Sequence, residues 1–382
     1  MEYREYQHIL PGAGRHLNKK PSWWQRTRID FMLLLLILLI MSSGLVVLYS
    51  GSGASFTAVE KQLLRYGLAM GVMIFLAQID LRKFSRWVPI FYLLGLLLLV
   101  AVLVLGYGAK GAQRWLMIPG ITRFQPSELM KLVLPLMLAW YLCRQPLPLS
   151  YQRILVALLL IIVPVLMVAR QPDLGTALLI SCSGIFVLFF AGISWRYIIG
   201  AIVSALSALP LLWMNMYAYQ KQRIRVFLNP ESDPLGTGWN IIQSKIAIGS
   251  GGLKGKGWLA GTQSHLDFLP ETHTDFIVAV LAEEFGLLGM VALLSLYLLL
   301  LLRCLYMASQ INLIFGRLLV SSYSLTFFVY IVVNIGMVSG LLPVVGVPLP
   351  LVSYGGTSAI TLLASLGLIM AAYADRRTKV EY

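Results

Sequence analysis

The sequence predicts an all-α polytopic membrane protein with ten transmembrane helices, and three observations support this class. Of the 382 residues, 58% are hydrophobic and 12% are charged, whereas soluble domains average about 25% charged residues. Several uncharged stretches approach or exceed the roughly 20 residues that a helix needs to cross the hydrocarbon core. The lysines and arginines are unevenly distributed among the connecting segments. A surface with so little charge needs lipid around it, which excludes an ordinary soluble domain.

Eight stretches before residue 310 are apolar enough for each to be interpreted as one membrane-spanning helix. The predicted spans are Phe31–Ser50, Tyr66–Ile79, Trp87–Ala109, Pro126–Cys143, Ile154–Ala169, Leu174–Trp195, Tyr197–Gln220 and Phe276–Leu302. The first follows a polar, basic segment, residues 1–30, and has no small-residue cleavage site. It is therefore predicted to be a retained span and not a removed signal peptide.

The region from Leu318 to Ala374 contains 57 residues and no charge. This is too long for one crossing, and it is interrupted by Pro343, Pro348 and Pro350 together with several glycines. Two helices joined by a Pro/Gly segment that dips into the membrane fit this pattern best. The total is then ten helices.

An even number of spans places both termini on the same side of the membrane. Seventeen of the 30 lysines and arginines fall in the termini and the even-numbered turns, so the positive-inside rule predicts cytoplasmic termini. The predicted organisation is a cytoplasmic segment 1–30, a transmembrane domain 31–375 and a cytoplasmic tail 376–382. A long extracytoplasmic loop, residues 221–275, joins helices seven and eight.

The net charge of +14 has two interpretations on the outer face, which carries the other thirteen basic residues. Long loops translocate regardless of charge, and this accounts for part of the set. However, Arg114, Arg123 and Lys131 lie in short loops or at helix ends, where the rule should apply. An anionic ligand on the outer face explains them, because arginine and lysine suit phosphate oxygens. These positions favour topology plus an anionic ligand over nucleic acid.

The long outer loop contains a glycine cluster, Gly249–Gly257, after a stretch, Ile241–Ile248, that is predicted to form a short amphipathic helix. The cluster resembles a phosphate-binding loop but fails the P-loop pattern at two positions. Either it is a plain turn, or it closes over a ligand with Lys254 and Lys256 as phosphate contacts.

Asp275 ends this loop where helix eight begins, beside His273. A carboxylate at a helix N-terminus is stabilised by the helix dipole, so simple capping and a catalytic role both remain open. Glu283 and Glu284 follow inside the apolar span, where ionisable groups are costly and normally face a cavity or a partner charge. At 100° per residue they are rotated by about 80° and 180° from Asp275, so one of the acids is expected to pair structurally.

Glu128 and Lys131 have i,i+3 spacing and can neutralise each other at the outer end of helix four. They form either a structural pair or part of a groove that holds a substrate headgroup. The three cysteines have unrelated spacings, and His265, His273 and Asp275 match no zinc signature. The sequence therefore predicts no particular metal site.

Several motifs together resemble the SEDS family (shape, elongation, division and sporulation), and within it the RodA branch. They are KGAQRWLMIPGITRFQPSE from Lys110, QPDLGT from Gln171, NPESDPLGTGWNIIQSKIAIGSGGLKGKG from Asn229, FLPETHTDFIVAVLAEEFG from Phe268 and GLLPVVGVPLPLVSYGGTS from Gly340. These segments run along nearly the whole chain, and the match is highly specific.

This resemblance implies a peptidoglycan glycosyltransferase that polymerises lipid II on the outer, periplasmic face of the bacterial inner membrane, for cell elongation and rod shape. Asp275, the acid of the HTDF motif, is then the general base for the acceptor 4-hydroxyl, and inversion releases undecaprenyl diphosphate. Basic residues are expected to stabilise the leaving diphosphate, and Glu128 to orient Lys131 or the headgroup. The implied substrate-binding residues are Arg114, Arg123, Glu128, Lys131, Lys245, Lys254, Lys256 and His273.

The resemblance also implies partners: a class B penicillin-binding protein transpeptidase and other elongation complex proteins. No firm cofactor is expected, and a divalent cation (Mg²⁺ or Mn²⁺) on the diphosphate is left open. Two rival functions are a lipid II flippase and a non-catalytic scaffold for the transpeptidase. A flippase needs polar groups along the whole transit route, whereas here they concentrate toward the outer half, which favours an enzyme.

Overall fold

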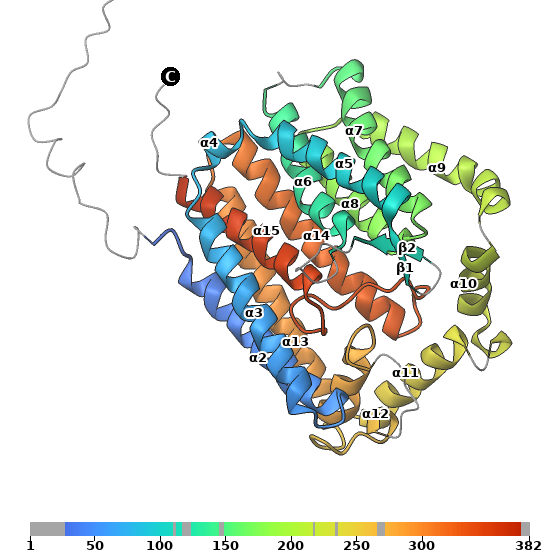
Figure 1. The fold of residues 1–382 in the computed structure, drawn as a ribbon. Coiled ribbons are helices and arrows are strands. Elements are labelled where there is room, and N and C mark those ends of the chain that lie inside the picture. Colours follow the sequence, from blue (N-terminus) through green and yellow to red (C-terminus); the bar gives the residue numbers. More distant parts are fainter. Residues whose placement is uncertain are drawn as a thin grey trace, which may run out of the picture.

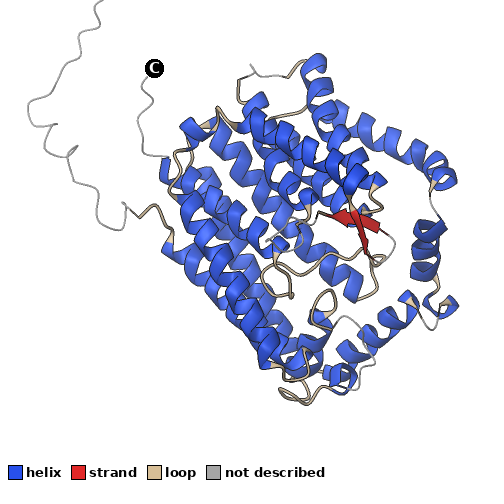
Figure 2. Ribbon diagram, viewed as in Figure 1, coloured by secondary structure: helices blue, strands red, loops and turns tan. Residues whose placement is uncertain are grey.

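The fold was described from a computed structural model, in which residues 27–109, 112–116, 124–144, 149–216, 218–233, 236–265 and 272–375 are placed. Most of these residues are helical, and the long helices pack side by side into a bundle (Figure 1). A single small strand pair lies among the helices in the described part of the chain (Figure 2). The polytopic helical class predicted from the sequence is therefore confirmed at the level of architecture.

Each of the ten predicted spans has a helix as its counterpart in the described ranges. The helices are α2 (Phe31–Gly51), α3 (Phe56–Ala77), α5 (Val88–Leu105), α6 (Pro126–Leu142), α7 (Tyr151–Arg170), α8 (Leu174–Phe190), α9 (Trp195–Asn215), α13 (Ile277–Ser309), α14 (Ile314–Val338) and α15 (Thr357–Ala374). Six of the described helices, α2, α5, α7, α13, α14 and α15, are long and apolar enough to cross a membrane by length and composition. The crossing of all ten stays a prediction.

Two predicted boundaries were wrong, for different reasons. Helix α3 begins at Phe56, ten residues before the predicted span, because Glu60, Lys61 and Arg65 break the apolar run but not the helix. Helix α5 ends at Leu105, where Gly106 adopts an extended conformation. The uncharged residues that follow form a hairpin of β1 (Tyr107–Ala109) and β2 (Ala112–Trp115), antiparallel with Ala109 opposite Ala112.

The predicted loop 221–275 contains several helices. They are α10 (Ala218–Leu228), the 3₁₀ turn η2 (Pro230–Ser232), α11 (Thr237–Gly251) and α12 (Thr262–His265). The amphipathic helix expected at 241–248 is confirmed but is longer than predicted. Helix α11 packs against α13, and the Ser244 hydroxyl donates to the backbone oxygen of Val338 at the end of α14 over 2.8 Å.

Helix α13 is broken at Gly286 (φ 63°, ψ −160°), and the glycine cluster after α11 fills the break. The amides of Lys256 and Gly257 donate to the backbone oxygens of Glu283 and Glu284 over 3.0 Å each, and Leu287 donates back to Gly252. A Cβ on Gly255 would come within 2.1 Å of the Glu284 oxygen. Because a side chain at Gly255 does not fit between these backbones, this position needs glycine for packing, whereas a Cβ at Gly249 or Gly252 would have no neighbour within 4 Å.

The segment between α14 and α15 has no helix and is partly buried. Tyr66 and Tyr297 donate their hydroxyls to the backbone oxygens of Leu351 and Pro350, over 2.7 and 2.5 Å. The Asn334 side chain donates to the Val347 oxygen over 2.7 Å. Hydroxyl and amide side chains thus satisfy backbone groups that cannot reach water, and this is how a Pro/Gly segment enters the bundle. The predicted Pro/Gly connection between two helices is confirmed, and its dip into the membrane stays a prediction.

Ion pairs tie helix ends together at the opposite end of the bundle. Asp30, the N-cap of α2, pairs with Arg303 of α13 over 2.5 Å. Asp375, just after α15, pairs with Arg28 and accepts from the Leu81 amide at the start of α4 (Leu81–Phe84). Most of the predicted basic segment, and all of the tail 376–382, lie outside the described residues.

Candidate active site

The turn that carries His273 and Asp275 is fixed by three other elements. The Thr272 hydroxyl donates to the Gly51 oxygen at the end of α2 over 2.7 Å. The Tyr354 amide donates to the His273 oxygen over 2.9 Å. The Asn334 side chain of α14 donates to the Asp275 oxygen over 3.1 Å. Because these contacts come from α2, α14 and the α14–α15 segment, the tertiary structure determines where Asp275 lies.

The Asp275 side chain is half-buried and lies beside the α14–α15 segment. A Cβ built on Gly346 would lie 3.5 Å from its Oδ2 atom. Asn334, which holds the Asp275 backbone, is one turn after Tyr330 on α14, so the two residues share a helix face. Tyr330 in turn contacts Lys131: the Lys131 Nζ atom lies 5.1 Å from the Tyr330 ring centroid. This face of α14 therefore links Asp275 to the Glu128–Lys131 pair.

Three side chains form a stack next to Asp275. The His273 ring meets the Tyr354 ring edge-on, with centroids 5.7 Å apart. The Arg65 guanidinium lies over the Tyr354 ring, 4.3 Å from its centroid, within the range of a cation–π contact. A Cβ on Gly356, at the start of α15, would be 3.5 Å from Arg65. Arg65 thus joins the catalytic candidate to the first turn of α15.

Arg65 lies on a part of α3 where apolar side chains are exposed. Its neighbours Leu63, Leu64 and Leu68 are 51%, 70% and 61% exposed, whereas Arg65 is half-buried against Tyr354. No carboxylate pairs with Arg65 among the described residues. The Arg65 guanidinium is therefore a cation placed over a tyrosine ring and next to exposed apolar side chains.

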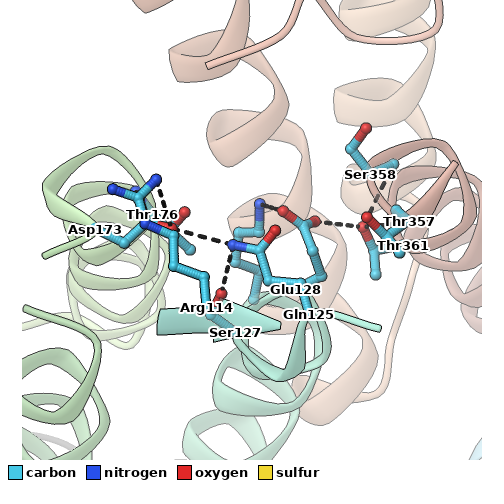
Figure 3. A network of polar contacts seen from close by, with 10 residues as sticks. Arg114, Gln125, Ser127, Glu128, Asp173, Thr176, Thr357, Ser358 and Thr361 are labelled. Carbon is cyan, nitrogen blue, oxygen red and sulfur yellow. Dashed lines mark hydrogen bonds and ion pairs between the residues drawn. The ribbon is translucent and has the colours of Figure 1, made fainter. Parts of the chain in front are cut away.

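Glu128 and Lys131 form the buried pair that their spacing predicted. The Lys131 Nζ lies 2.5 Å from Oε1 of Glu128, and Thr361 of α15 donates to Oε2 over 3.0 Å (Figure 3). Both charged side chains are less than a tenth exposed. The pair is held by side chains of α6, α14 and α15, and Lys131, Tyr330 and Thr361 line a cavity of about 30 Å³.

Arg114 belongs to a neighbouring network that the sequence did not predict. Its guanidinium donates to the Pro172 oxygen over 2.5 Å and lies 3.7 Å from the Asp173 carboxylate. Gln125 also donates to Asp173, and Asp173 caps the first turn of α8 through the Thr176 amide (Figure 3). Arg114 therefore joins the β1–β2 hairpin to α8 through the QPDLGT motif.

The remaining sequence-predicted residues are dispersed. Lys245 of α11 lies against Gly340, where a Cβ would be 2.8 Å from its Nζ. Lys254 is exposed in the glycine cluster. Lys256 pairs with Glu283 over 2.7 Å, so the expectation that one acid after Asp275 pairs structurally is confirmed. Glu284 accepts from Ser50, so Glu283 and Glu284 contact different elements. Arg123 lies outside the described residues.

Within the described ranges, no three His, Cys, Asp or Glu side chains come together to hold a metal ion. These residues therefore do not form a protein-only metal site, and the divalent cation stays a prediction. Sequence reasoning missed Arg65, Tyr330, Tyr354 and Thr361 as members of the site. Arg65 gave a signal as a charge directly before a predicted span, and Tyr354 lies in the GLLPVVGVPLPLVSYGGTS motif. Tyr330 and Thr361 are uncharged residues in apolar helices.

The sequence profile described as cell cycle protein, FtsW/RodA/SpoVE, matches residues 26–378. The chain is 50% identical over 361 residues to peptidoglycan glycosyltransferase MrdB of Escherichia coli K12, covering 94% of this chain and 97% of that one. It is 38% identical over 374 residues to a probable peptidoglycan glycosyltransferase FtsW of Geobacter metallireducens, covering 93% and 97%.

Two solved structures have the same fold. A chain of a peptidoglycan synthase complex that coordinates polymerization and crosslinking superposes with a TM-score of 0.80 at 35% identity, covering 92% of this chain and 99% of that one. The crystal structure of the rod shape determining protein RodA of Thermus thermophilus gives 0.70 at 32% identity, covering 92% and 98%.

Proposed function

This chain belongs to the SEDS family of FtsW, RodA and SpoVE cell cycle proteins, and we propose that it is an inverting peptidoglycan glycosyltransferase that polymerises lipid II for cell elongation. The observation that carries this proposal is the position of Asp275. Its side chain is half-buried, and the turn that carries it is held by contacts from α2, α14 and the α14–α15 segment. The same face of α14 reaches Lys131 through Tyr330. Relatives named peptidoglycan glycosyltransferase over nearly their whole length support the same activity.

In the proposed reaction the Asp275 carboxylate takes the proton of the acceptor 4-hydroxyl. The acceptor oxygen forms a bond to the donor anomeric carbon as the bond from that carbon to the diphosphate oxygen breaks, with inversion. The electron pair leaves with undecaprenyl diphosphate. A positioned general base contributes about 10²–10⁴-fold to such a step, and cations near the leaving oxygens stabilise the developing charge.

The leaving diphosphate is proposed to lie near Arg65 and Lys131. Arg65 faces the lipid side and has no carboxylate partner among the described residues, so its charge remains available to a ligand. Lys131 is already neutralised by Glu128. In this proposal the pair rearranges when substrate binds, and the Lys131 ammonium then contacts the diphosphate. Lys245, Lys254, His273 and Arg114 remain predicted substrate-binding residues.

The proposed topology has ten crossings, both termini in the cytoplasm and Asp275 facing the periplasm. The distribution of lysines and arginines supports this orientation. In it, the ion pairs of Asp30 and Asp375 lie at the cytoplasmic ends of α2, α13 and α15, and the Asp275 turn lies at the outer ends. The site then opens where lipid-linked precursors wait in the outer leaflet.

A class B penicillin-binding protein is the proposed partner. The similar synthase complex coordinates polymerization and crosslinking, which supports a transpeptidase beside this chain, and elongation complex proteins are proposed as further partners.

The proposal is tested with purified protein and lipid II, with glycan chains resolved by size. We expect Asp275→Asn to lower chain formation by at least about a hundredfold, with unchanged thermal unfolding. Glu231→Gln, which removes an exposed carboxylate from η2, is the matched control. Undiminished chains from the Asn variant would overturn the base assignment. No chains from wild type, with lipid II transfer across vesicles intact, would favour the flippase, and neither activity would favour the scaffold.

A further inference from the structure

Asn334 is a buried polar residue of α14 whose side chain joins two other segments. It has no solvent-exposed surface. Its Nδ2 atom donates to the backbone oxygen of Asp275 over 3.1 Å and to the backbone oxygen of Val347 over 2.7 Å. A side-chain amide has two N–H donors, so both are used. One amide group therefore connects the turn that carries the proposed base to the segment that follows α14.

The two contacts also determine how the amide of Asn334 is oriented. Both partners are carbonyl oxygens, which only accept hydrogen bonds, so Nδ2 and not Oδ1 must face them. The Oδ1 atom is buried and accepts no hydrogen bond from the residues that the structure places, which costs free energy. A serine or threonine hydroxyl would avoid this cost, but its single donor could hold only one of the two segments. The position is therefore built for a double donor.

The segment that Asn334 holds passes beside the carboxylate of Asp275. Gly346 precedes Val347 and has a φ of 73°, and a Cβ built on it would lie 3.5 Å from Oδ2 of Asp275. The backbone of this segment also packs closely against the first turn of α8, where a Cβ on Gly175 would be 2.7 Å from the Val345 oxygen. Contacts with α8 and with Asn334 thus place the backbone that borders the carboxylate.

We infer that Asn334 is a positioning residue for the base: its amide fixes the Asp275 turn relative to residues 345–347 and so holds the carboxylate where it takes the proton of the acceptor hydroxyl. This inference rests on the proposed function. Asn334 does not contact the reacting atoms and acts only through Asp275. Because proton transfer needs hydrogen-bond reach, a small displacement of the base costs a large part of the rate.

The test measures kcat and KM for lipid II with the purified full-length chain, together with thermal unfolding. Asn334→Ala should lower kcat per folded molecule by about 10²-fold, as for a misplaced catalytic group. The KM should change by less than about twofold, because the lost interaction acts on the chemical step and not on binding. Asn334→Asp keeps the size of the side chain but replaces the double donor by an oxygen, and it should lower kcat to a similar extent.

Ser322→Ala is the matched control on the same helix. The Ser322 hydroxyl is buried and donates to the Ser183 backbone oxygen over 2.8 Å, so it makes the same kind of contact as Asn334. It precedes Asn334 by twelve positions, which is about 18 Å along a helix. Ser322→Ala should lower the unfolding temperature without lowering kcat per folded molecule. Equal kcat losses in Ser322→Ala and Asn334→Ala would show a general effect of loosening α14 and would overturn the inference.

Gly346→Ala changes the same segment without touching Asn334, because alanine rarely adopts a positive φ. It should also lower kcat at an unchanged KM, and it keeps the test decisive if Asn334→Ala does not fold. A kcat near that of wild type in the folded variants, with Asp275→Asn inactive, would overturn the positioning role.

Hydrogen exchange supplies a readout that needs no activity. Backbone amides in peptides that contain residues 272–276 should exchange faster in Asn334→Ala, or in Gly346→Ala if the first does not fold, than in wild type and Ser322→Ala. Unchanged exchange would overturn the inference whether or not the chain polymerises lipid II. A wild type that makes no chains, or an active Asp275→Asn, would contradict the proposed function instead.

Discussion

Two glutamate–lysine pairs at the same end of the molecule have similar geometry and different surroundings. Glu283 and Lys256 lie 2.7 Å apart, and Glu128 and Lys131 lie 2.5 Å apart. The Oε1 atom of Glu283 also accepts from the backbone amides of Thr262 and Gln263. Glu128 instead has side-chain donors on α6 and α15. The first carboxylate is therefore held by backbone amides at the start of α12, and the second by side-chain donors.

Burial makes the same distinction. Lys256 is 28% exposed, whereas Lys131 is 7% exposed and borders a cavity of about 30 Å³, which has room for a water molecule. The Lys256 pair fastens the glycine cluster to the break in α13. The Lys131–Glu128 pair is buried and borders this small cavity. Tyr330 and Asn334, on one face of α14, connect it to the Asp275 turn. Identical residue types therefore have different surroundings in the two places, and we expect only the Lys131 pair to affect the use of substrate.

The largest expected effect comes from breaking the buried pair. Lys131→Met should lower polymerisation by about 10²-fold or more, as for removal of one charge-stabilising donor, and should also lower thermal stability because Glu128 is left buried and unpaired. The neutral double variant Glu128→Gln/Lys131→Met should regain stability but not activity. If the double variant polymerises normally, the Glu128–Lys131 pair is structural like the Glu283–Lys256 pair. The proposed difference in role between the two pairs is then wrong.

Glu283→Ala is expected to have the next largest effect, on stability. It removes the acceptor of two backbone amides and a lysine, at a cost of about 1–3 kcal/mol, and thermal unfolding in detergent measures it. Activity per folded molecule should stay near wild type. Glu283→Gln keeps an oxygen acceptor and should lose less. An activity loss in Glu283→Ala that exceeds its stability loss would place this pair in the site as well.

Arg65→Gln should raise the KM for lipid II by about tenfold, the size expected for one charge-assisted hydrogen bond, with a smaller change in kcat. Arg65→Lys keeps the positive charge but loses the guanidinium over the Tyr354 ring. Its KM should lie between those of wild type and Arg65→Gln. Arg196→Gln removes an arginine from the far end of the bundle and serves as the control. An unchanged KM in Arg65→Gln, from a wild-type enzyme that polymerises, would remove Arg65 from the diphosphate contact.

The smallest expected effect is on salt dependence. Double-mutant cycles on each pair, measured at low and at high ionic strength, should show the Lys256–Glu283 coupling falling by a few tenths of a kcal/mol. The buried Lys131–Glu128 coupling should change less, because buried pairs are poorly screened. Equal salt dependence would mean that water reaches both pairs alike.

Much of the fold could be predicted from the sequence because lipid imposes a simple rule. A helix satisfies its own backbone, so apolar length alone located the ten helices and the broken segment after α14. Predicted helix boundaries were wrong where apolar length is not informative. The charged residues of α3 are helical, and the uncharged residues Tyr107–Ala109 form a strand. Asp275 and the Glu128–Lys131 pair could be predicted as site residues because they are charged residues within or beside apolar spans.

The sequence by itself determined the helical class, the charge asymmetry and which titratable residues are candidates for chemistry. Only the tertiary structure decided the partners that are distant along the chain. Lys131 pairs with Glu128 three residues away, as its spacing predicted, whereas Lys256 pairs with Glu283, 27 residues further along the chain. Arg65 is placed in the candidate site by its contact with the ring of Tyr354, a residue 289 positions away along the chain. Such contacts depend on how distant helices pack against one another, and helical periodicity describes only the face of a single helix.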